Sequence, residues 1–359
     1  MEKKSGGRQS NTQSFVYQDA CDVVKFLTNN ATDHALVLPG RIPGYKRDDI
    51  KLLPSLHTKV IVYDQYKTIL EKSDENKSER VRLQEQQHLY IVQQERSLYN
   101  AMVSDAKSTC KQHGIMQLTT NLPCSRNLSM HYSFDYAQQV HLPSNPMQPG
   151  PLYFLVPRKV EIFGVCCEGI PKQVNFLVDE GHLISKGSNA VISYMDFYFD
   201  HYGIGETVAN LHCNNCSSQN KNRCMIWYCA WRVAKRLHHS ISLNFLIAGH
   251  TKFAPDWYFG LMKKSFRRHS VPALSVLQEG VNLSSSVNVA QVVGTEDGTT
   301  IVPVYDWQNF FAEDCQPLPG IKSYQHFRFD CQHPGTVFAK SATDSEEKIF
   351  YILKNNKRG

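Results

Sequence analysis

Residues 206–237 read ETVANLHCNNCSSQNKNRCMIWYCAWRVAKRL, and this stretch decides the fold. Its first part, residues 206–213, is a short β-prone run that predicts a strand. Residues 219–237 carry apolar side chains at helical spacing and predict a helix. The junction between a strand and the next helix is where many α/β folds hold their chemistry. The polar corner between the two elements is therefore the first place to look for a metal site, a phosphate site or an active site.

The neighbouring segments extend this alternation in both directions. Before the stretch lie four β-prone runs and then one helical pattern, at residues 128–139, 152–156, 160–167, 173–180 and 188–203. The helical pattern has Ser188 as its expected N-cap. After the stretch come a strand pattern at 240–249 and a helix pattern at 255–268, which begins with Pro255. A ribonuclease-H-like fold has this order of elements: a meander of strands, followed by helix, strand, helix, strand and helix. The sequence here predicts one strand more than the minimal version of that fold. We therefore expect an α/β protein with a ribonuclease-H-like mixed sheet flanked by helices.

The chain divides by composition into three predicted regions. Residues 1–125 form a helical, charged region, residues 126–270 the ribonuclease-H-like core, and residues 271–359 a small β-rich extension of that core. In the first region one apolar stripe follows helical spacing, at Leu89, Val92, Tyr99, Met102 and Ala106. The extension has strand candidates at residues 287–294, 299–305 and 324–329. The stripe predicts either a helix packed on the next domain or a helix that joins two copies into a homo-oligomer.

Composition limits the classes of function. The 359 residues are 42% hydrophobic and 20% charged, which is typical of a globular protein with a sizeable core. No apolar run approaches the roughly 20 residues that a membrane span needs, so we expect no membrane partner. The N-terminus lacks a secretory signal and the 11 cysteines show no even framework, which favours a nuclear or cytoplasmic, intracellular location. The formal charge of +6 permits DNA as a partner without requiring it.

Two acids and one amide occupy the positions where such a fold holds a two-metal site. Carboxylates from separate strand ends can hold two Mg²⁺ ions about 4 Å apart, because hard oxygen ligands and shared negative charge suit these cations. Asp135 lies inside a strand pattern, where a charge is uncommon unless it is paired or ligating. Asp256 opens the last helix, a position that the helix dipole alone also favours. At the middle position the chain has Asn214 instead of an acid.

Four segments resemble a family of transposon-derived domains of unknown function, which is abundant in invertebrate and fungal genomes. They are HYSFDYAQQVHLP (131–143), QPGPLYFLVPRKVEIFG (148–164), LHCNNCSSQNKN (211–222) and GHTKFAPDWYFG (249–260). The resemblance implies a DDE-type transposase core of ribonuclease-H-like fold, with Mg²⁺ or Mn²⁺ as cofactor if the site is functional. It makes Asp135 the first acid and Asp256 the third. Asn214 stands where the family has its second aspartate.

The exchange of aspartate for asparagine keeps the shape of the side chain and removes one negative charge. At an effective dielectric constant near 20, one charge at about 4 Å is worth roughly 4 kcal/mol. We therefore expect a degenerate metal site in a protein that binds nucleic acid and cleaves it little or not at all. One alternative is an active Mg²⁺-dependent nuclease or strand-transfer enzyme in which Asp179 or Glu180 supplies the missing ligand. A second alternative is a protein-interaction scaffold that works through the N-terminal helix.

Basic residues near these acids are candidates for contacts with a nucleic-acid backbone. Lys221 lies at the entrance of the helix after the polar corner, where a phosphate can bind. Lys263, Lys264, Arg267 and Arg268 lie on the last helix of the core. An N-cap network and a solvated basic face are the competing interpretations of the two groups.

The cysteines of the polar corner have the spacing of half a zinc site. Cys213 and Cys216 would need a second pair, for which Cys224 and Cys229 are the nearest candidates. That second pair falls in an apolar helix, so we expect no zinc. His212 precedes the corner and is expected to be a core or rim histidine.

Overall fold

The computed structural model describes residues 23–29, 36–37, 51–52, 59–73, 79–145, 156–247, 249–250 and 252–354. The chain forms two compact units, residues 1–87 and residues 88–359. The described elements of the first unit are a short helix at 23–29, the antiparallel strands β1 (Leu36–Val37) and β2 (Lys51–Leu52), and helix α2 (Lys59–Ser73). Helix α3 (Glu79–Gln112) spans the boundary between the two units. The predicted strand at 152–156 lies outside the described residues except for its last position.

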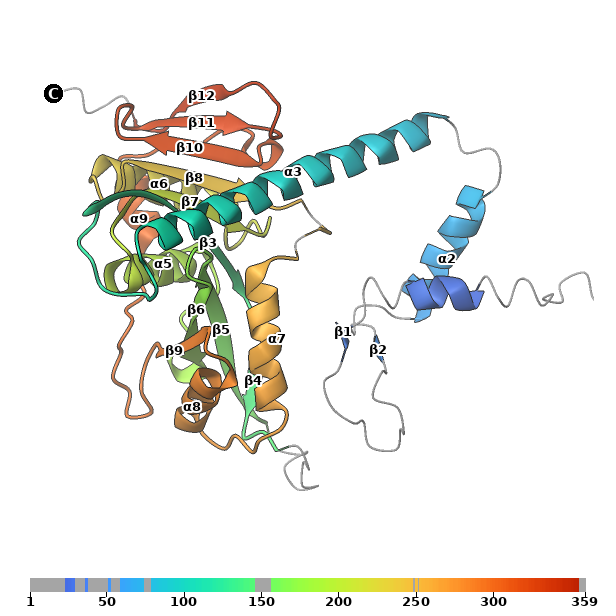
Figure 1. The fold of residues 1–359 in the computed structure, drawn as a ribbon, viewed down its shortest axis with the longest axis horizontal. Coiled ribbons are helices and arrows are strands. Elements are labelled where there is room, and N and C mark those ends of the chain that lie inside the picture. Colours follow the sequence, from blue (N-terminus) through green and yellow to red (C-terminus); the bar gives the residue numbers. More distant parts are fainter. Residues whose placement is uncertain are drawn as a thin grey trace, which may run out of the picture. The chain divides into compact units, whose positions relative to one another are not determined.

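A ten-stranded mixed sheet forms the body of the second unit (Figure 1). Its strands in chain order are β3 (Arg126–Tyr136), β4 (Val140–Leu142), β5 (Arg158–Cys167), β6 (Lys172–Asp179), β7 (Glu206–Cys213), β8 (Ser240–Phe245), β9 (Asn288–Val292), β10 (His326–Asp330), β11 (Thr336–Lys340) and β12 (Lys348–Tyr351). Their order across the sheet is β12-β11-β10-β8-β7-β3-β5-β6-β9, and β4 pairs with β5.

The direction of the strands divides this sheet into an antiparallel and a parallel part. β3, β5 and β6 form an antiparallel meander, whereas β3, β7 and β8 are parallel. β10 pairs antiparallel with β8, so the C-terminal strands extend the same sheet instead of forming a separate one. β9 adds a parallel strand beside β6 at the opposite edge. This mixed sheet with flanking helices confirms the predicted fold class.

Helices cover both faces of the sheet. They are α5 (Ser188–Tyr202), α6 (Arg223–Ala234), α7 (Ala254–Phe266), α8 (Leu274–Ser284) and α9 (Trp307–Ala312), with the short 3₁₀ helices η1 (Glu180–His182) and η2 (Ile321–Ser323). α5, α6 and α9 share one apolar cluster with the sheet, and α7 and α8 share another. On β5, Phe163 and Val165 belong to the first cluster, whereas Val160 and Ile162 belong to the second. Neighbouring side chains of a strand point to opposite faces, so a strand buried on both faces is apolar throughout.

Close packing of α7 on the sheet depends on one glycine. A Cβ built on Gly164 of β5 would lie 2.7 Å from ring carbons of Phe259 on α7. Any side chain at this position would therefore push α7 away from β5. The helix that carries Asp256 is held close to the sheet for this reason.

Two local expectations are wrong. The N-cap of α5 is Gly187, and Ser188 is the first helical residue. Residues 299–305 form no strand but a single bridge between Thr300 and Gly294. Pro303 has no backbone N–H to donate to a strand ladder, which accounts for the second difference.

The apolar stripe predicted for the N-terminal helix is buried at some positions and exposed at others. Tyr99 and Ala106 are buried, whereas Leu89 is 60% exposed. The later part of α3 therefore packs on the core, as the first interpretation of the stripe expected. Self-association through the earlier part stays a prediction.

Candidate functional site

The first two candidate side chains meet at the ends of two parallel strands. Phe134 of β3 lies opposite Cys213 of β7, so the residues that follow, Asp135 and Asn214, are side by side. The Nδ2 group of Asn214 donates a hydrogen bond to Oδ1 of Asp135 at 2.6 Å. The parallel register predicted for this part of the sheet thus brings the acid and the amide together.

The other end of the Asn214 amide is used inside the polar corner. Its Oδ1 accepts hydrogen bonds from the backbone N–H of Cys216 and from Nδ2 of Asn220, both at 2.9 Å. A backbone N–H can only donate, so the amide oxygen must face Cys216 and the amide nitrogen must face Asp135. Both lone pairs of the oxygen are engaged, and the oxygen is therefore not free to bind a cation in this arrangement.

Asp135 holds its proton more tightly than an ordinary aspartate. Burial raises the pKa of its carboxyl group to about 7, the N–H of Tyr136 opposes this rise, and the negative charge of Asp256 adds to it. The Tyr136 N–H lies 2.8 Å from Oδ1 of Asp135. The influence of Asp256 on Asp135 shows that the third candidate residue belongs to the same electrostatic environment.

Asp256 stands in the first turn of α7, where it also caps the helix. Its Oδ2 accepts a hydrogen bond from the N–H of Phe253 at 3.3 Å. The residue is exposed, yet partial desolvation raises the pKa of its carboxyl group, while the Phe253 N–H and the charges of Lys263 and Lys252 oppose the rise.

Helix α3 fixes the segment that leads into α7. Arg96 donates from Nη1 to the carbonyl of Lys252 at 2.6 Å and from Nη2 to the carbonyl of His250 at 3.0 Å. The hydroxyl of Tyr99 accepts from the N–H of Ala254 at 3.3 Å and donates to Oε1 of Glu168 at 2.7 Å. These contacts position the backbone two to six residues before Asp256. Sequence patterns gave no sign of this role, because it depends on a contact between residues more than 150 positions apart.

The expectation that Asp179 or Glu180 replaces the missing acid is wrong. Asp135 lies opposite Gly164, and Asp179 lies opposite Val160 on the same strand. At about 3.3 Å per residue and about 4.8 Å between strands, this register separates the two aspartates by roughly 16 Å.

Both acids have other partners at that end of the sheet. Asp179 forms an ion pair with Arg158 at 2.5 Å, and Glu180 accepts the N–H of Lys159 at 3.0 Å. Neither side chain is available to the cluster around Asp135.

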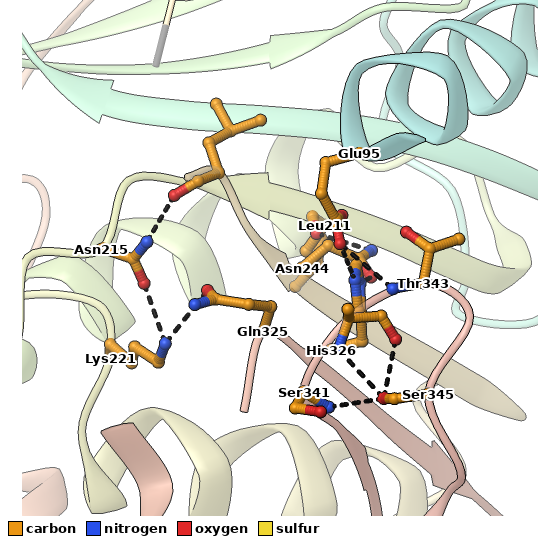
Figure 2. A network of polar contacts seen from close by, with 12 residues as sticks. Glu95, Leu211, Asn215, Lys221, Asn244, Gln325, His326, Ser341, Thr343 and Ser345 are labelled. Atoms are coloured by element: carbon orange, nitrogen blue, oxygen red, sulfur yellow. Dashed lines mark hydrogen bonds and ion pairs between the residues drawn. The ribbon is translucent and has the colours of Figure 1, made fainter. Parts of the chain in front are cut away.

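Lys221 is buried instead of facing solvent, and Figure 2 shows its Nζ between the side chains of Asn215 and Gln325. Its Nζ donates to Oδ1 of Asn215 at 2.9 Å and to Oε1 of Gln325 at 3.1 Å, and it lies 5.2 Å from the centre of the Phe245 ring. Burial lowers the pKa of Lys221 to about 8. The ammonium group therefore points into the fold, and the predicted phosphate contact at this residue lacks an exposed charge.

The basic residues of α7 have a different setting. Lys264, Arg267 and Arg268 are exposed, and Lys263 is half-buried. Burial lowers the pKa of Lys263, as does the charge of Arg267, while Asp256 opposes the shift. Three of these four predicted contacts therefore present their charge to solvent.

A row of polar side chains next to the site was not predicted. Four adjacent strands, β3, β7, β8 and β10, place one polar residue each at the same level: Ser133, His212, Asn244 and His326. His326 contacts Oδ1 of Asn244 at 2.8 Å and Oε1 of Glu95 at 2.9 Å (Figure 2). His212 is buried and contacts His131 at 2.8 Å, and burial lowers the pKa of both histidines. Polar residues that interrupt apolar strands were the signal, but the pairing of β8 with β10 cannot be seen in the sequence.

The described cysteines near the corner do not form a metal site. Cys213, Cys224 and Cys229 are buried, and Cys216 contacts Oγ of Ser218. Within the part of the chain that the structure describes, no three His, Cys, Asp or Glu side chains group closely enough to hold a metal ion. Among the same residues, no helix combines the length and the apolar character of a membrane span.

The donor set does not fit a pair of divalent cations. Such a pair needs several anionic oxygens held close together. Here Asn214 is neutral and its oxygen is engaged, so Asp135 and Asp256 are the only two carboxylates among the three candidate residues.

The fold and the site together define a mixed α/β protein with a carboxylate and an amide at the ends of two central strands and a second carboxylate in the first turn of α7. The chain belongs to the family of the domain of unknown function DUF7869, which matches residues 156–347. No curated protein and no solved structure matches the chain. The matched residues include Asn214 and Asp256, whereas Asp135 on β3 lies before them.

Proposed function

We propose that this protein binds nucleic acid through a ribonuclease-H-like site in which Asn214 replaces the second acid, and that it cleaves nucleic acid little or not at all. The observation that carries the proposal is the hydrogen bond from Asn214 to Asp135. In a two-metal enzyme the corresponding acids point their oxygens at shared cations. Here the N–H of the amide takes the place of the cation against Asp135, so the corner is stable without one.

Binding of nucleic acid is supported by the helix that begins beside the site. Lys264, Arg267 and Arg268 are exposed on or directly after α7, whose first turn carries Asp256. Exposed Lys and Arg side chains bind phosphates by releasing condensed counterions, and this contact needs no metal at the site. The descent from a transposase that the sequence motifs imply is part of the same proposal.

Cleavage and binding are tested on the same substrates. Wild-type protein, Asp135→Ala and Asn214→Asp are incubated with labelled single-stranded and double-stranded DNA in Mg²⁺ or Mn²⁺, and affinity is measured by fluorescence anisotropy at several salt concentrations. We expect wild type to bind with an affinity that falls with salt and to leave the DNA intact.

Two results contradict the proposal in different ways. Cleavage by wild type that disappears in Asp135→Ala would show that catalysis survives Asn214. Affinity too weak to measure at low salt for every nucleic acid would show that the basic helix has another purpose.

A further inference from the structure

Helix α7 has one face against the sheet and one face toward solvent. Pro255, Phe259 and Met262 are buried and mark the inner face. At 100° per residue, Trp257 lies on the opposite side of the helix, in line with Gly260, Lys264 and, just beyond the helix end, Arg268. Trp257, Gly260, Lys264 and Arg268 are all exposed. The outer face therefore combines one aromatic ring, one gap and two positive charges.

Trp257 is the unusual member of this row. Its side chain is 70% exposed, although a tryptophan can bury more apolar area than any other side chain. It directly follows Asp256, whose carboxylate contributes to the environment of Asp135. The ring thus lies beside the candidate site and is not required by the core.

Gly260 leaves room between the ring and the charges. No atom of the protein lies within 4 Å of a Cβ built at this position, so packing does not demand a glycine. A glycine inside an exposed helix lowers helix stability relative to alanine. Without a side chain at this position, the helix backbone is open to close approach by a ligand.

We infer that the outer face of α7 binds an unpaired nucleic-acid strand, with one base stacked on Trp257 and the backbone following Gly260 to Lys264 and Arg268. Lys264 lies about 10 Å along the helix axis from Trp257, and Arg268 lies about 6 Å further. Proteins that bind single-stranded nucleic acids commonly combine an aromatic side chain for base stacking with a line of positive charge for the backbone. The bases of a duplex are stacked on each other, so only an unpaired base offers its face to the ring. The inference rests on the proposed function and specifies its substrate class.

Substitution of the ring tests the stacking contact. Affinities of wild type, Trp257→Ala and Tyr351→Ala are measured by anisotropy for oligodeoxythymidylate, oligouridylate and a DNA duplex. Tyr351 is the matched control, because it is 72% exposed on the edge strand β12. We expect Trp257→Ala to weaken single-strand binding roughly 5- to 100-fold, with the melting temperature and duplex binding unchanged. Tyr351→Ala should behave as wild type.

A second pair of variants tests the α7 track, the path of the nucleic-acid backbone over Gly260 between the Trp257 ring and the positive charges. Gly260→Glu adds bulk and negative charge on α7, and Gly280→Glu makes the same change on α8, where a Cβ also meets no atom within 4 Å. Glutamate is a better helix former than glycine, so both variants should melt at or above the temperature of wild type. Single-strand affinity should fall at least 5-fold in Gly260→Glu and stay within about 2-fold in Gly280→Glu.

The outcomes separate this inference from the function on which it rests. Wild type that binds duplex and single strands equally, with no effect of Trp257→Ala or Gly260→Glu, overturns the α7 track and leaves nucleic-acid binding intact. Wild type that binds none of the three probes overturns both. Loss of single-strand binding in Trp257→Ala and Gly260→Glu, with both controls unaffected, supports the track.

Discussion

Asn214→Asp should turn the corner into a site whose stability depends on divalent cations. The variant replaces the 2.6 Å hydrogen bond between Asn214 and Asp135 by a contact between two carboxyl groups. At an effective dielectric constant near 20, two full charges about 4 Å apart repel by about 4 kcal/mol. At about pH 5.5 the pair can share a proton, so we expect a loss in the free energy of unfolding below about 1 kcal/mol. At about pH 8.5 both groups are charged, and the loss should reach about 2 to 4 kcal/mol.

Urea denaturation at the two pH values, with and without Mg²⁺ or Mn²⁺, measures this effect. A cation that binds only the folded state adds RT ln(1 + [L]/Kd), which is about 2.7 kcal/mol at a concentration 100 times Kd. The cation should therefore restore most of the loss in Asn214→Asp at high pH and change wild type little.

Asn215→Asp is the matched control for the added charge. Its new carboxylate would face the Nζ of Lys221, which the wild-type Asn215 oxygen contacts at 2.9 Å. The variant also loses the hydrogen bond that Nδ2 of Asn215 donates to the carbonyl of Leu246, so its stability can change, but that change should not depend on divalent cations. Equal stability of Asn214→Asp and wild type at high pH, or an equal gain from Mg²⁺ in both variants, would refute the shared site.

Three further perturbations address single elements of the site. Arg96→Ala removes two hydrogen bonds to the backbone before α7 and should lower the free energy of unfolding by about 1.5 to 3 kcal/mol in urea titrations; an unchanged midpoint would show that α3 does not hold this segment. Asp135→Asn removes a carboxyl group whose pKa is about 7 in the folded state and near 3.8 in the unfolded state. Because the folded state binds the proton more tightly, the free energy of unfolding of wild type should fall by up to about 4 kcal/mol relative to this variant as the pH rises from about 4 to about 8. Lys221→Met removes an amine whose pKa is about 8 in the folded state and 10.5 in the unfolded state. The free energy of unfolding of wild type should therefore rise by about 3 kcal/mol relative to this variant between about pH 8 and about pH 10.5. Parallel pH profiles of the two proteins would contradict the burial of Lys221 as a cation.

Local sequence patterns were sufficient for the elements around the corner. The run before Asn214 and the periodic segment after it became β7 and α6, because a buried parallel strand and an amphipathic helix each have a recognisable spacing. The parallel register then followed from the fold class and placed Asn214 beside Asp135. These inferences needed only neighbouring residues and one rule of topology.

Two other expectations, the exposure of Lys221 and the place of Asp179 in the site, were wrong because they depend on contacts between distant parts of the chain. Lys221 follows a polar corner, which favours exposure, but Gln325 from the segment before β10 and the ring of Phe245 enclose it. Asp179 ends a strand as an acid ligand would, but the antiparallel register moves it four positions beyond the level of Asp135. Neither the pairing of β10 with β8 nor this register is encoded in local composition.

The extent of the site explains why the matched family region alone cannot define its function. Residues 156–347 contain the corner after β7 and the start of α7, but β3 lies between β5 and β7 at the centre of the sheet. β3 carries Asp135, and α3 holds the backbone that precedes Asp256. A protein from this family without equivalents of both elements would have a sheet interrupted between β5 and β7 and no partner for the residue at position 214. In this chain the pair at that position is a carboxylate and an amide, which stabilise each other through a hydrogen bond, whereas two carboxylates at the same place would repel each other.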